Sequence, residues 1–157
     1  MFVYWKVSSS STTDLRDQCK NLQIPNLLDS SNYHVSIMSS NNVADNYTCK
    51  NSFEPVMAKP LSYLCRKNAT TNTNVLLLRL ECQPCLDRHQ ELKEKYHLIH
   101  RFNDYEPHLT LSYDVGMNFD PQSVPVPNSQ LELNEECVEE QNSDKIKQLT
   151  NDKSTKN

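Results

Sequence analysis

The sequence predicts an α+β fold of two pseudo-symmetric strand-helix-strand lobes, with antiparallel sheets around a central cleft. Two strand-like runs in different halves of the chain each contain a histidine and a hydroxyl residue two positions apart. Each run follows an earlier strand and a helical segment. The spacing also agrees, since Tyr4 lies 30 residues before His34 and Leu78 lies 30 residues before His108. Matching order and spacing indicate an internal duplication.

The chain has 157 residues, the length of one ordinary domain. We expect a folded domain over residues 1–138, with lobes at about 1–66 and 67–138. From residue 139 onward the chain is polar and has almost no apolar residues. Such a composition cannot bury enough apolar surface to order itself, so we expect residues 139–157 to be a disordered tail.

The first half begins with aromatic and β-branched residues, which favour a strand. Leu15, Cys19 and Leu22 then recur at the spacing of one helix face. In chain order we expect a strand over 2–7, a helix over 13–22 capped by Thr12 or Thr13, and strands over 33–38 and 53–58.

The second half repeats this order after a polar loop at 67–74. A strongly hydrophobic run is followed by the clearest helical pattern in the chain, in which Leu86, His89 and Leu92 mark a mixed face. We expect a strand over 75–82, a helix over 85–98, and strands over 107–114 and 129–137.

Composition excludes several functional classes. The net charge of −4 argues against a binder of long nucleic acid, which needs a basic surplus. No segment approaches the roughly 18–20 apolar residues of a membrane span. Gly116 is the single glycine, so phosphate-binding loops built from several glycines are excluded. We therefore expect a cytoplasmic protein with reduced cysteines, whose contacts to phosphate come from side chains.

Strand side chains alternate between two faces. His34 and Ser36 therefore share one face, while Tyr33, Val35 and Ile37 take the other. The apolar set can form the core, which leaves the histidine and the hydroxyl on the open face.

The later strand has the same pattern. His108 and Thr110 share one face, and Leu109, Leu111 and Tyr113 point the opposite way. If the two halves pair about a pseudo-twofold axis, two imidazoles and two hydroxyls line one cleft.

Two histidines and two hydroxyls suit the cleavage of a phosphodiester. One histidine can act as general base and the other as general acid, because imidazole titrates near neutral pH. The hydroxyls of Ser36 and Thr110 can donate hydrogen bonds to the non-bridging oxygens. Neither a metal nor another cofactor is needed, and structural histidines are the less favoured interpretation.

The first strand adds a second pair. Tyr4 and Lys6 share one face, and Val3, Trp5 and Val7 share the other. Alone, Tyr4 and Lys6 would be a solvent-facing edge. Beside two histidines they suit an aromatic base and a phosphate.

Another pattern, Cys82-x2-Cys85 followed by His89, could supply three zinc ligands or a redox pair. No second pair of ligands stands at a convincing spacing. We favour a strand end that turns into a helix at Pro84, with His89, His97 and His100 on the helix surface and in a loop.

Paired His-x-Ser/Thr motifs on strands of a duplicated chain resemble the two-histidine (2H, LigT-like) phosphoesterases. The stretches "FVYWKV", "YHVSIMSS", "VLLLRLEC" and "YEPHLTLSYDVG" are most similar to the phage anti-CBASS nucleases of that superfamily. The resemblance spans residues 2–137. It implies a metal-independent phosphodiesterase that cleaves cyclic di- and trinucleotide messengers and thereby evades host immunity, in the host cytoplasm if the protein is viral.

The resemblance also implies roles for residues. His34 and His108 would be the catalytic pair, with Ser36 and Thr110 as phosphate donors. Tyr4, Lys6 and a glutamate of the last strand would bind the substrate. For that glutamate Glu136 is favoured over Glu132. A tryptophan that stacks on a base in the family has no counterpart here, because Trp5 is the only one and should face the core.

Three alternatives remain open from the sequence. One is a 2H enzyme that acts on 2′–5′ oligoadenylates or on RNA 2′,3′-cyclic ends. Another is a sponge that binds a cyclic nucleotide without cleaving it. The third is a small zinc-binding interaction protein built on Cys82, Cys85 and His89. The oligomeric state and the base preference are left open.

Overall fold

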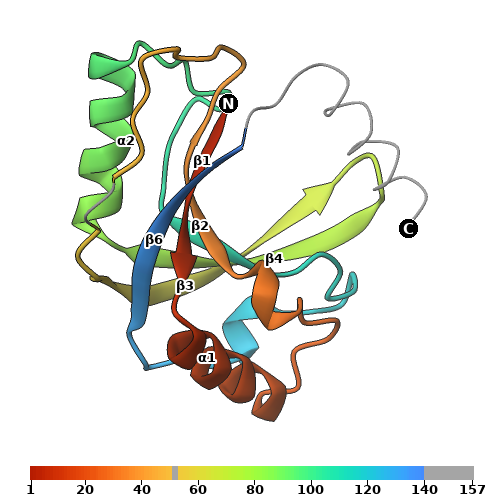
Figure 1. Cartoon of the computed structure of the whole chain (residues 1–157). Helices are drawn as coiled ribbons and strands as arrows, with labels where there is room; N and C mark the ends of the chain where they lie inside the picture. Colours follow the sequence, from red (N-terminus) through yellow and green to blue (C-terminus); the bar gives the residue numbers. More distant parts are fainter. Residues whose placement is uncertain (51–52, 140–157) are drawn as a thin grey trace.

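The structure is a computed structural model that describes residues 1–50 and 53–139. The predicted polar tail, beyond Glu139, lies outside the described residues. Ten elements follow one another along the chain (Figure 1): β1 (Phe2–Val7), α1 (Ser9–Asn21), η1 (Ser30–Asn32), β2 (His34–Ser39), β3 (Val56–Asn68), β4 (Thr73–Glu81), α2 (Gln83–Lys95), β5 (His108–Ser112), η2 (Pro121–Ser123) and β6 (Leu131–Glu139).

The strands form a closed ring in the order β1-β2-β5-β4-β3-β6, and all neighbours are antiparallel. Two joints of the ring are narrow. At one, β2 pairs with β5 through Val35 and Leu109 alone. At the other, β3 pairs with β6 only over Val56–Ala58. The ring therefore consists of two three-stranded groups, β6-β1-β2 and β5-β4-β3, which confirms the predicted α+β fold with pseudo-symmetric lobes.

The two groups repeat the same strand register. Lys6 of β1 lies opposite His34 of β2, and Arg79 of β4 lies opposite His108 of β5. A β-bulge interrupts both ladders at the corresponding place, two to three residues before these cations. The two groups therefore share their backbone register and a β-bulge as well as their strand order.

The register corrects one detail of the predicted repeat. Tyr4 lies opposite Ser36, and Leu77 lies opposite Thr110, so Leu77 is the counterpart of Tyr4. The equal spacing of 30 residues selected Leu78 instead. Leu78 is fully buried and faces the core, because a shift of one residue along a strand changes the face.

Each group contains one strand from the other half of the sequence. β6 comes from the end of the described chain and lies beside β1, and β3 comes from the first half and lies beside β4. β3 and β4 form a long hairpin that extends away from the rest of the ring (Figure 1). The division of the chain into lobes at about residue 66 stays a prediction.

The core lies between the strands and the two helices. As predicted, β1 directs Val3, Trp5 and Val7 into it. The largest side chains that are almost fully buried are Trp5, Leu15, Ile37, Met38, Leu76, Leu78, Leu92, Leu109, Leu111, Leu131, Leu133 and Val3. Burial of this apolar surface is the main driving force for the fold.

Both helices start earlier than predicted. The Oγ of Ser8 accepts a hydrogen bond from the Ser11 amide and caps α1, so neither Thr12 nor Thr13 is the cap. Pro84 lies in the first turn of α2, where its missing N–H costs nothing. Within the described residues, no helix is long and apolar enough to span a membrane.

Candidate active site

The two motif histidines are held in the same way. The Nδ1 of His34 lies 2.8 Å from the carbonyl oxygen of Asn32, and the Nδ1 of His108 lies 2.9 Å from that of Glu106. A carbonyl oxygen can only accept, so each Nδ1 carries the proton and donates it. Each ring is thereby oriented with Nε2 left for chemistry, and the anchor is the carbonyl two residues earlier in both cases.

The narrow joint between β2 and β5 brings the two motifs together. Val35 pairs with Leu109, and both side chains are fully buried. In this antiparallel register each histidine lies next to the hydroxyl residue of the other strand. The neighbours are His34 with Thr110, and His108 with Ser36.

Side-chain alternation is as predicted on both strands, with one exception. The four motif residues are half-buried, whereas the apolar residues between them are buried. Tyr113 was expected in the core but is 50% exposed. β5 ends at Ser112, so the alternation no longer applies at position 113.

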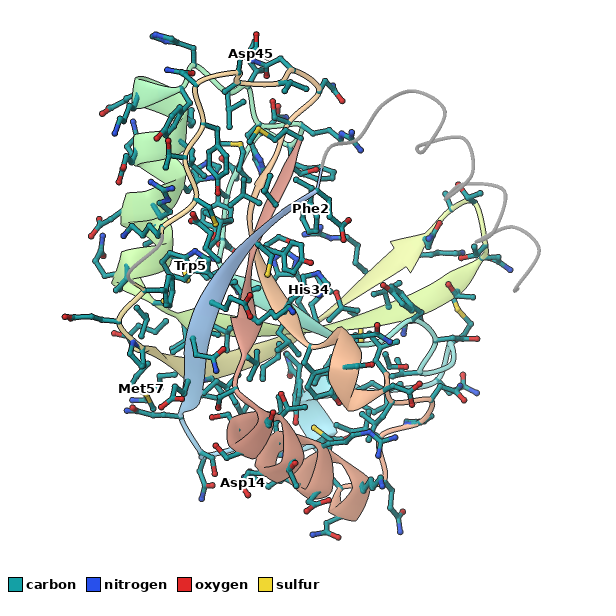
Figure 2. The ribbon with its side chains drawn as sticks, viewed as in Figure 1. Phe2, Trp5, Asp14, His34, Asp45 and Met57 are labelled. Carbon is teal, nitrogen blue, oxygen red and sulfur yellow. The ribbon has the colours of Figure 1, made fainter. Side chains whose placement is uncertain are left out.

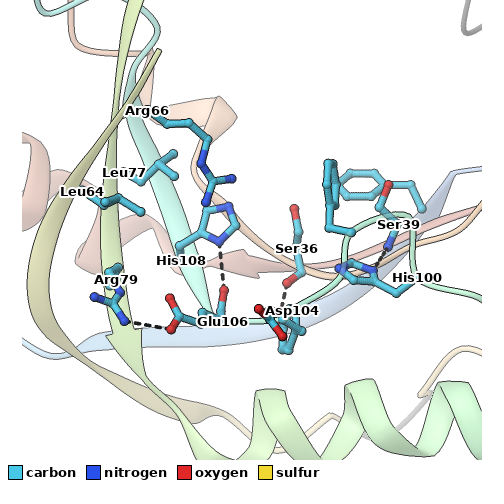
Figure 3. Close-up of a pocket in the computed structure, with 13 residues that line it drawn as sticks. Ser36, Ser39, Leu64, Arg66, Leu77, Arg79, His100, Asp104, Glu106 and His108 are labelled. Carbon is cyan, nitrogen blue, oxygen red and sulfur yellow. Dashed lines mark hydrogen bonds and ion pairs between the residues drawn. The ribbon is translucent and has the colours of Figure 1, made fainter. Parts of the chain in front are cut away.

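A cavity of about 530 Å³ lies beside the motifs. In Figure 3 its cationic side chains, Arg66 and Arg79, gather with His108 at one end, and Ser39 and His100 lie at the other end. The lining residues are Phe2, Ser36, Ser39, Leu64, Arg66, Leu77, Arg79, His100, Phe102, Asp104, Tyr105, Glu106 and His108.

The surroundings of His108 favour the neutral form of its imidazole. Burial lowers the pKa of His108, and the positive charges of Arg66 and His34 lower it further. Hydrogen bonding to the Glu106 carbonyl and the Glu106 charge oppose this only in part. A neutral imidazole at pH 7 can accept a proton, which a general base requires.

Tyr4 and Lys6 lie on the same side as His34. The Tyr4 ring is 5.1 Å from the His34 ring, centre to centre, and Phe2 contacts both rings. Burial, with the nearby Cys137 and Glu139, raises the pKa of Tyr4 to about 12, so its hydroxyl stays protonated. Lys6 is exposed and its Nζ lies 3.8 Å from a carboxylate oxygen of Glu135.

Glu136 does not lie with these residues. Its side chain is fully buried beneath α2, where Arg88 donates two hydrogen bonds of 2.8 and 3.0 Å to it. Trp5 Nε1, the Tyr47 hydroxyl and the Lys50 amide also donate to it. Figure 2 shows Trp5 and His34 on different sides of β1. The predicted contact of Glu136 with substrate is therefore corrected to a structural role.

A bulge in β6 explains the difference. Val7 pairs with Leu133 but its neighbour Lys6 pairs with Glu135, so Asn134 is an extra residue. The insertion reverses the alternation that Leu131 and Leu133 set up. Glu135 thereby reaches the Lys6 side.

The other candidate, Glu132, lies near the start of α1. Its backbone amide donates to the Oγ of Ser11 and its carbonyl accepts from the Ser8 amide. The strand thus presents neither predicted glutamate to the cavity.

Most cavity residues other than Ser36 and His108 were not found from the sequence, and three of them are charged or aromatic side chains suited to a nucleotide. Arg79 is the counterpart of Lys6, and its Nη2 lies 2.8 Å from Glu106, whose carbonyl anchors His108. Arg79 is the single basic residue in the hydrophobic run of residues 75–82, which could have indicated it. Arg66 comes from β3, which had been predicted to end at residue 58. Phe102 is an aromatic residue on a loop and is 59% exposed.

His89 is placed differently from the prediction, whereas His100 lies in the segment after α2, as predicted. His89 is buried, donates from Nδ1 to the Ile37 carbonyl at 2.7 Å, and stacks on Tyr105 at 4.1 Å. The Tyr105 hydroxyl in turn donates to the Ser36 carbonyl. Burial, with the charges of His89 and Lys93, lowers the pKa of His100 to about 4. These rings support β2 from behind the motif.

All six cysteines are free in the structure. Cys82 caps α2 without a side-chain hydrogen bond to the helix, and Cys85 is fully buried. In the part of the chain that the structure describes, no group of three or more His, Cys, Asp or Glu side chains is arranged to hold a metal ion.

The family model of the anti-CBASS protein Acb1 matches residues 1–148. The chain belongs to the Acb1 family. Membership confirms the resemblance inferred from the sequence. It implies that the ligand is a cyclic oligonucleotide, which the protein degrades or sequesters.

The fold likeness agrees with the family. The crystal structure of TT0787 of Thermus thermophilus matches with a TM-score of 0.54, at 12% identity, over 85% of this chain and 84% of that chain. At this identity the match shows the fold alone, which is that of the 2H phosphoesterases. No curated protein gives a significant match.

Proposed function

We propose that this Acb1-family protein is a metal-independent phosphodiesterase that cleaves 3′–5′ linked cyclic di- or trinucleotides. One observation carries the proposal: two histidines, each fixed through Nδ1 to a backbone carbonyl, lie on the two strands of the joint between β2 and β5, and neither Nε2 has a hydrogen-bond partner among the described residues. Acid–base cleavage of a phosphodiester needs two such groups, one on each side of the phosphorus.

His108 is assigned as the general base and His34 as the general acid. The lowered pKa of His108 keeps its Nε2 free to accept a proton. His108 removes a proton from the attacking hydroxyl, which is either the ribose 2′-hydroxyl or a water. As the new P–O bond forms, the bond to the leaving oxygen breaks, and His34 donates a proton to that oxygen. The hydroxyls of Ser36 and Thr110 stabilise the charge on the non-bridging oxygens.

The cavity suits the other parts of a nucleotide. Phe2 and Phe102 offer aromatic faces on which a base can stack, in place of the family tryptophan. Arg66 and Arg79 supply local positive charge that the net charge of −4 hides. Such a site binds a compact anion without the basic groove that long nucleic acid requires.

The experiment is to incubate the purified protein, in EDTA, with a panel of cyclic di- and trinucleotides and with linear 2′–5′ oligoadenylates, and to separate the products by chromatography. We expect linear products from the cyclic substrates and a rate unaffected by EDTA. Cleavage of the 2′–5′ oligomers alone would show that the substrates are 2′–5′ oligoadenylates and not cyclic nucleotides. Tight binding without any cleavage would make the protein a sponge and contradict the mechanism.

A further inference from the structure

The segment that leads into β5 brings two carboxylates to the cavity. Exposure alternates along this segment, so that Tyr105 is more buried than Asp104 and Glu106. The Tyr105 ring stacks on His89, and its hydroxyl donates to the Ser36 carbonyl oxygen at 2.8 Å. Asp104 and Glu106 therefore lie on the other side of the segment, and both line the cavity.

The two carboxylates differ in what neutralises them. Glu106 lies 2.8 Å from the Nη2 of Arg79. Asp104 takes part in none of the ion pairs of residues 1–50 and 53–139. Figure 3 shows it between Glu106 and His100. Because an unpaired carboxylate repels phosphate, Asp104 suits a part of the nucleotide that carries N–H donors, which is the base.

An aromatic side chain comes from the same segment. Phe102 precedes Asp104 by two residues, lines the same cavity and is 59% exposed. Its ring lies 5.6 Å from the His100 ring, centre to centre, in an edge arrangement. Proteins that recognise an unpaired base stack it on an aromatic ring and form hydrogen bonds with its Watson–Crick edge. Phe102 and Asp104 offer one contact of each kind.

The Watson–Crick edges of the bases differ in how well they match a carboxylate, which can only accept hydrogen bonds. Guanine presents two adjacent donors, N1–H and the 2-amino group, which fit the two carboxylate oxygens. Adenine and cytosine place a ring-nitrogen acceptor beside their amino group, and uracil places a carbonyl oxygen on each side of its N–H. Guanine is therefore the base that a carboxylate selects.

We propose that Asp104 determines base specificity by accepting hydrogen bonds from N1–H and the 2-amino group of a guanine that stacks on Phe102, while a phosphate of the same nucleotide lies at His108. This inference rests on the proposed function. Asp104 and His108 are four residues apart, so their Cα atoms are separated by at most roughly 14 Å. That span suits one nucleotide, whose base and phosphate lie at opposite ends. Arg66 and Arg79 lie with His108, at the end assigned to phosphate.

Binding of nucleoside 3′-monophosphates tests this role without any cleavage. We expect guanosine 3′-monophosphate to bind about tenfold more tightly than inosine 3′-monophosphate, which lacks only the 2-amino group and so loses one charge-assisted hydrogen bond. Asp104→Asn replaces one acceptor with a donor. It should raise the Kd of the guanosine ligand at least tenfold and remove the preference over inosine. Asp45→Asn is the matched control, because it removes the same charge at an exposed position outside the cavity.

A third ligand separates base recognition from a general effect of charge. Adenosine 3′-monophosphate should bind Asp104→Asn at least as tightly as the unmodified protein, because the amide can donate to the adenine N1. Equal affinity of the unmodified protein for the guanosine and inosine ligands would overturn the inference. So would a preference that survives in Asp104→Asn.

Cleavage of cyclic dinucleotides by the unmodified protein is scored separately. Cleavage without a preference for guanosine over inosine would contradict the role of Asp104 alone. A preference for guanosine without any cleavage would contradict the proposed chemistry and leave the role of Asp104 standing. No binding of any of these nucleotides would overturn both.

Discussion

The two polar clusters on opposite faces of β1 differ in how completely they are satisfied. Glu136 accepts hydrogen bonds from Arg88, Trp5, Tyr47 and the Lys50 amide, and its side chain has no exposure to solvent. His34 and His108, in contrast, each use one ring nitrogen for a backbone carbonyl and keep the other. A buried and saturated cluster can contribute to stability but cannot react with a ligand. The open pair can do chemistry and should contribute little to stability.

Removal of either histidine is expected to give the largest effect. His34→Ala or His108→Ala should lower the rate of cyclic dinucleotide cleavage by roughly 10²–10⁴-fold, the usual contribution of a general acid or base. Urea denaturation should show a free energy of unfolding within about 1 kcal/mol of the original, because one hydrogen bond is lost. The matched control is His97→Asn, since His97 is exposed, lies outside the cavity and has a positive φ of 55° that Asn tolerates. A His34→Ala protein that keeps most of its rate would refute the assignment.

The opposite result is expected for the buried cluster. Arg88→Met leaves the Glu136 carboxylate buried without its cation, which should lower the free energy of unfolding by about 3–5 kcal/mol. The protein that remains folded should still cleave substrate. Lys93→Met, at an exposed position of the same helix, is the control.

A second variant identifies the cause of that loss. In Arg88→Met/Glu136→Gln the buried charge is gone, so this double variant should be more stable than Arg88→Met. Equal stability of the two would mean that Arg88 acts through packing and not through its charge.

Acidification should reduce the stability of the fold and the rate of cleavage at different pH values. These effects should be smaller than those of the substitutions. Burial alone would raise the pKa of Glu136, but the hydrogen bonds from Arg88, the Lys50 amide and Trp5 lower it to about 2. A carboxylate with a depressed folded pKa stabilises the fold fully above its ordinary value of about 4.5. This stabilisation, about 3 kcal/mol, is lost as the pH falls from there toward 2.

The rate of cleavage should fall at a higher pH than the stability does. His108 must be neutral to act as base, and its pKa is lowered from about 6.5, so the loss of rate begins below pH 6.5. Denaturation curves and initial rates between pH 7 and 3 would measure both. Glu136→Gln should flatten the stability profile below pH 4.5 and leave the onset of the rate loss unchanged. A rate and a stability that fall together would contradict the separation.

The sequence was sufficient for the parts of the fold that depend on local alternation. β2 alternates over His34–Ile37 and β5 over His108–Leu111, so the side of the strand on which His34 and His108 lie could be predicted. The fold class followed from element order, and the family from the motifs on these two strands. Where the pattern was local and regular, the prediction was confirmed.

The predictions were wrong for residues whose positions depend on distant segments or on irregular backbone. Glu136 was assigned to the site because the resemblance implies a glutamate of the last strand. Nothing in the sequence marks the extra residue in β6, which reverses the face of the residues beyond it. Arg66 was missed because β3 is longer than its apolar residues indicate, and pairing with β4 extends it. The burial of His89 depends on its contact with β2. These features come from tertiary pairing, which a single sequence does not encode in any short window.

The closure of the ring has a consequence for how the protein folds. The bond between Trp5 and Glu136 joins residues 131 positions apart, and β1 cannot complete its pairing until β6 is available. Such non-local contacts require loop entropy to be lost before they give any stabilisation, so folds dominated by non-local strand pairing fold slowly, in roughly milliseconds to seconds. We therefore expect the ring to close late in folding, after the β3–β4 hairpin, whose strands are neighbours in the chain, has formed. During that interval the unpaired edges of β1 and β6 are exposed to other chains, so refolding yield should fall as protein concentration rises.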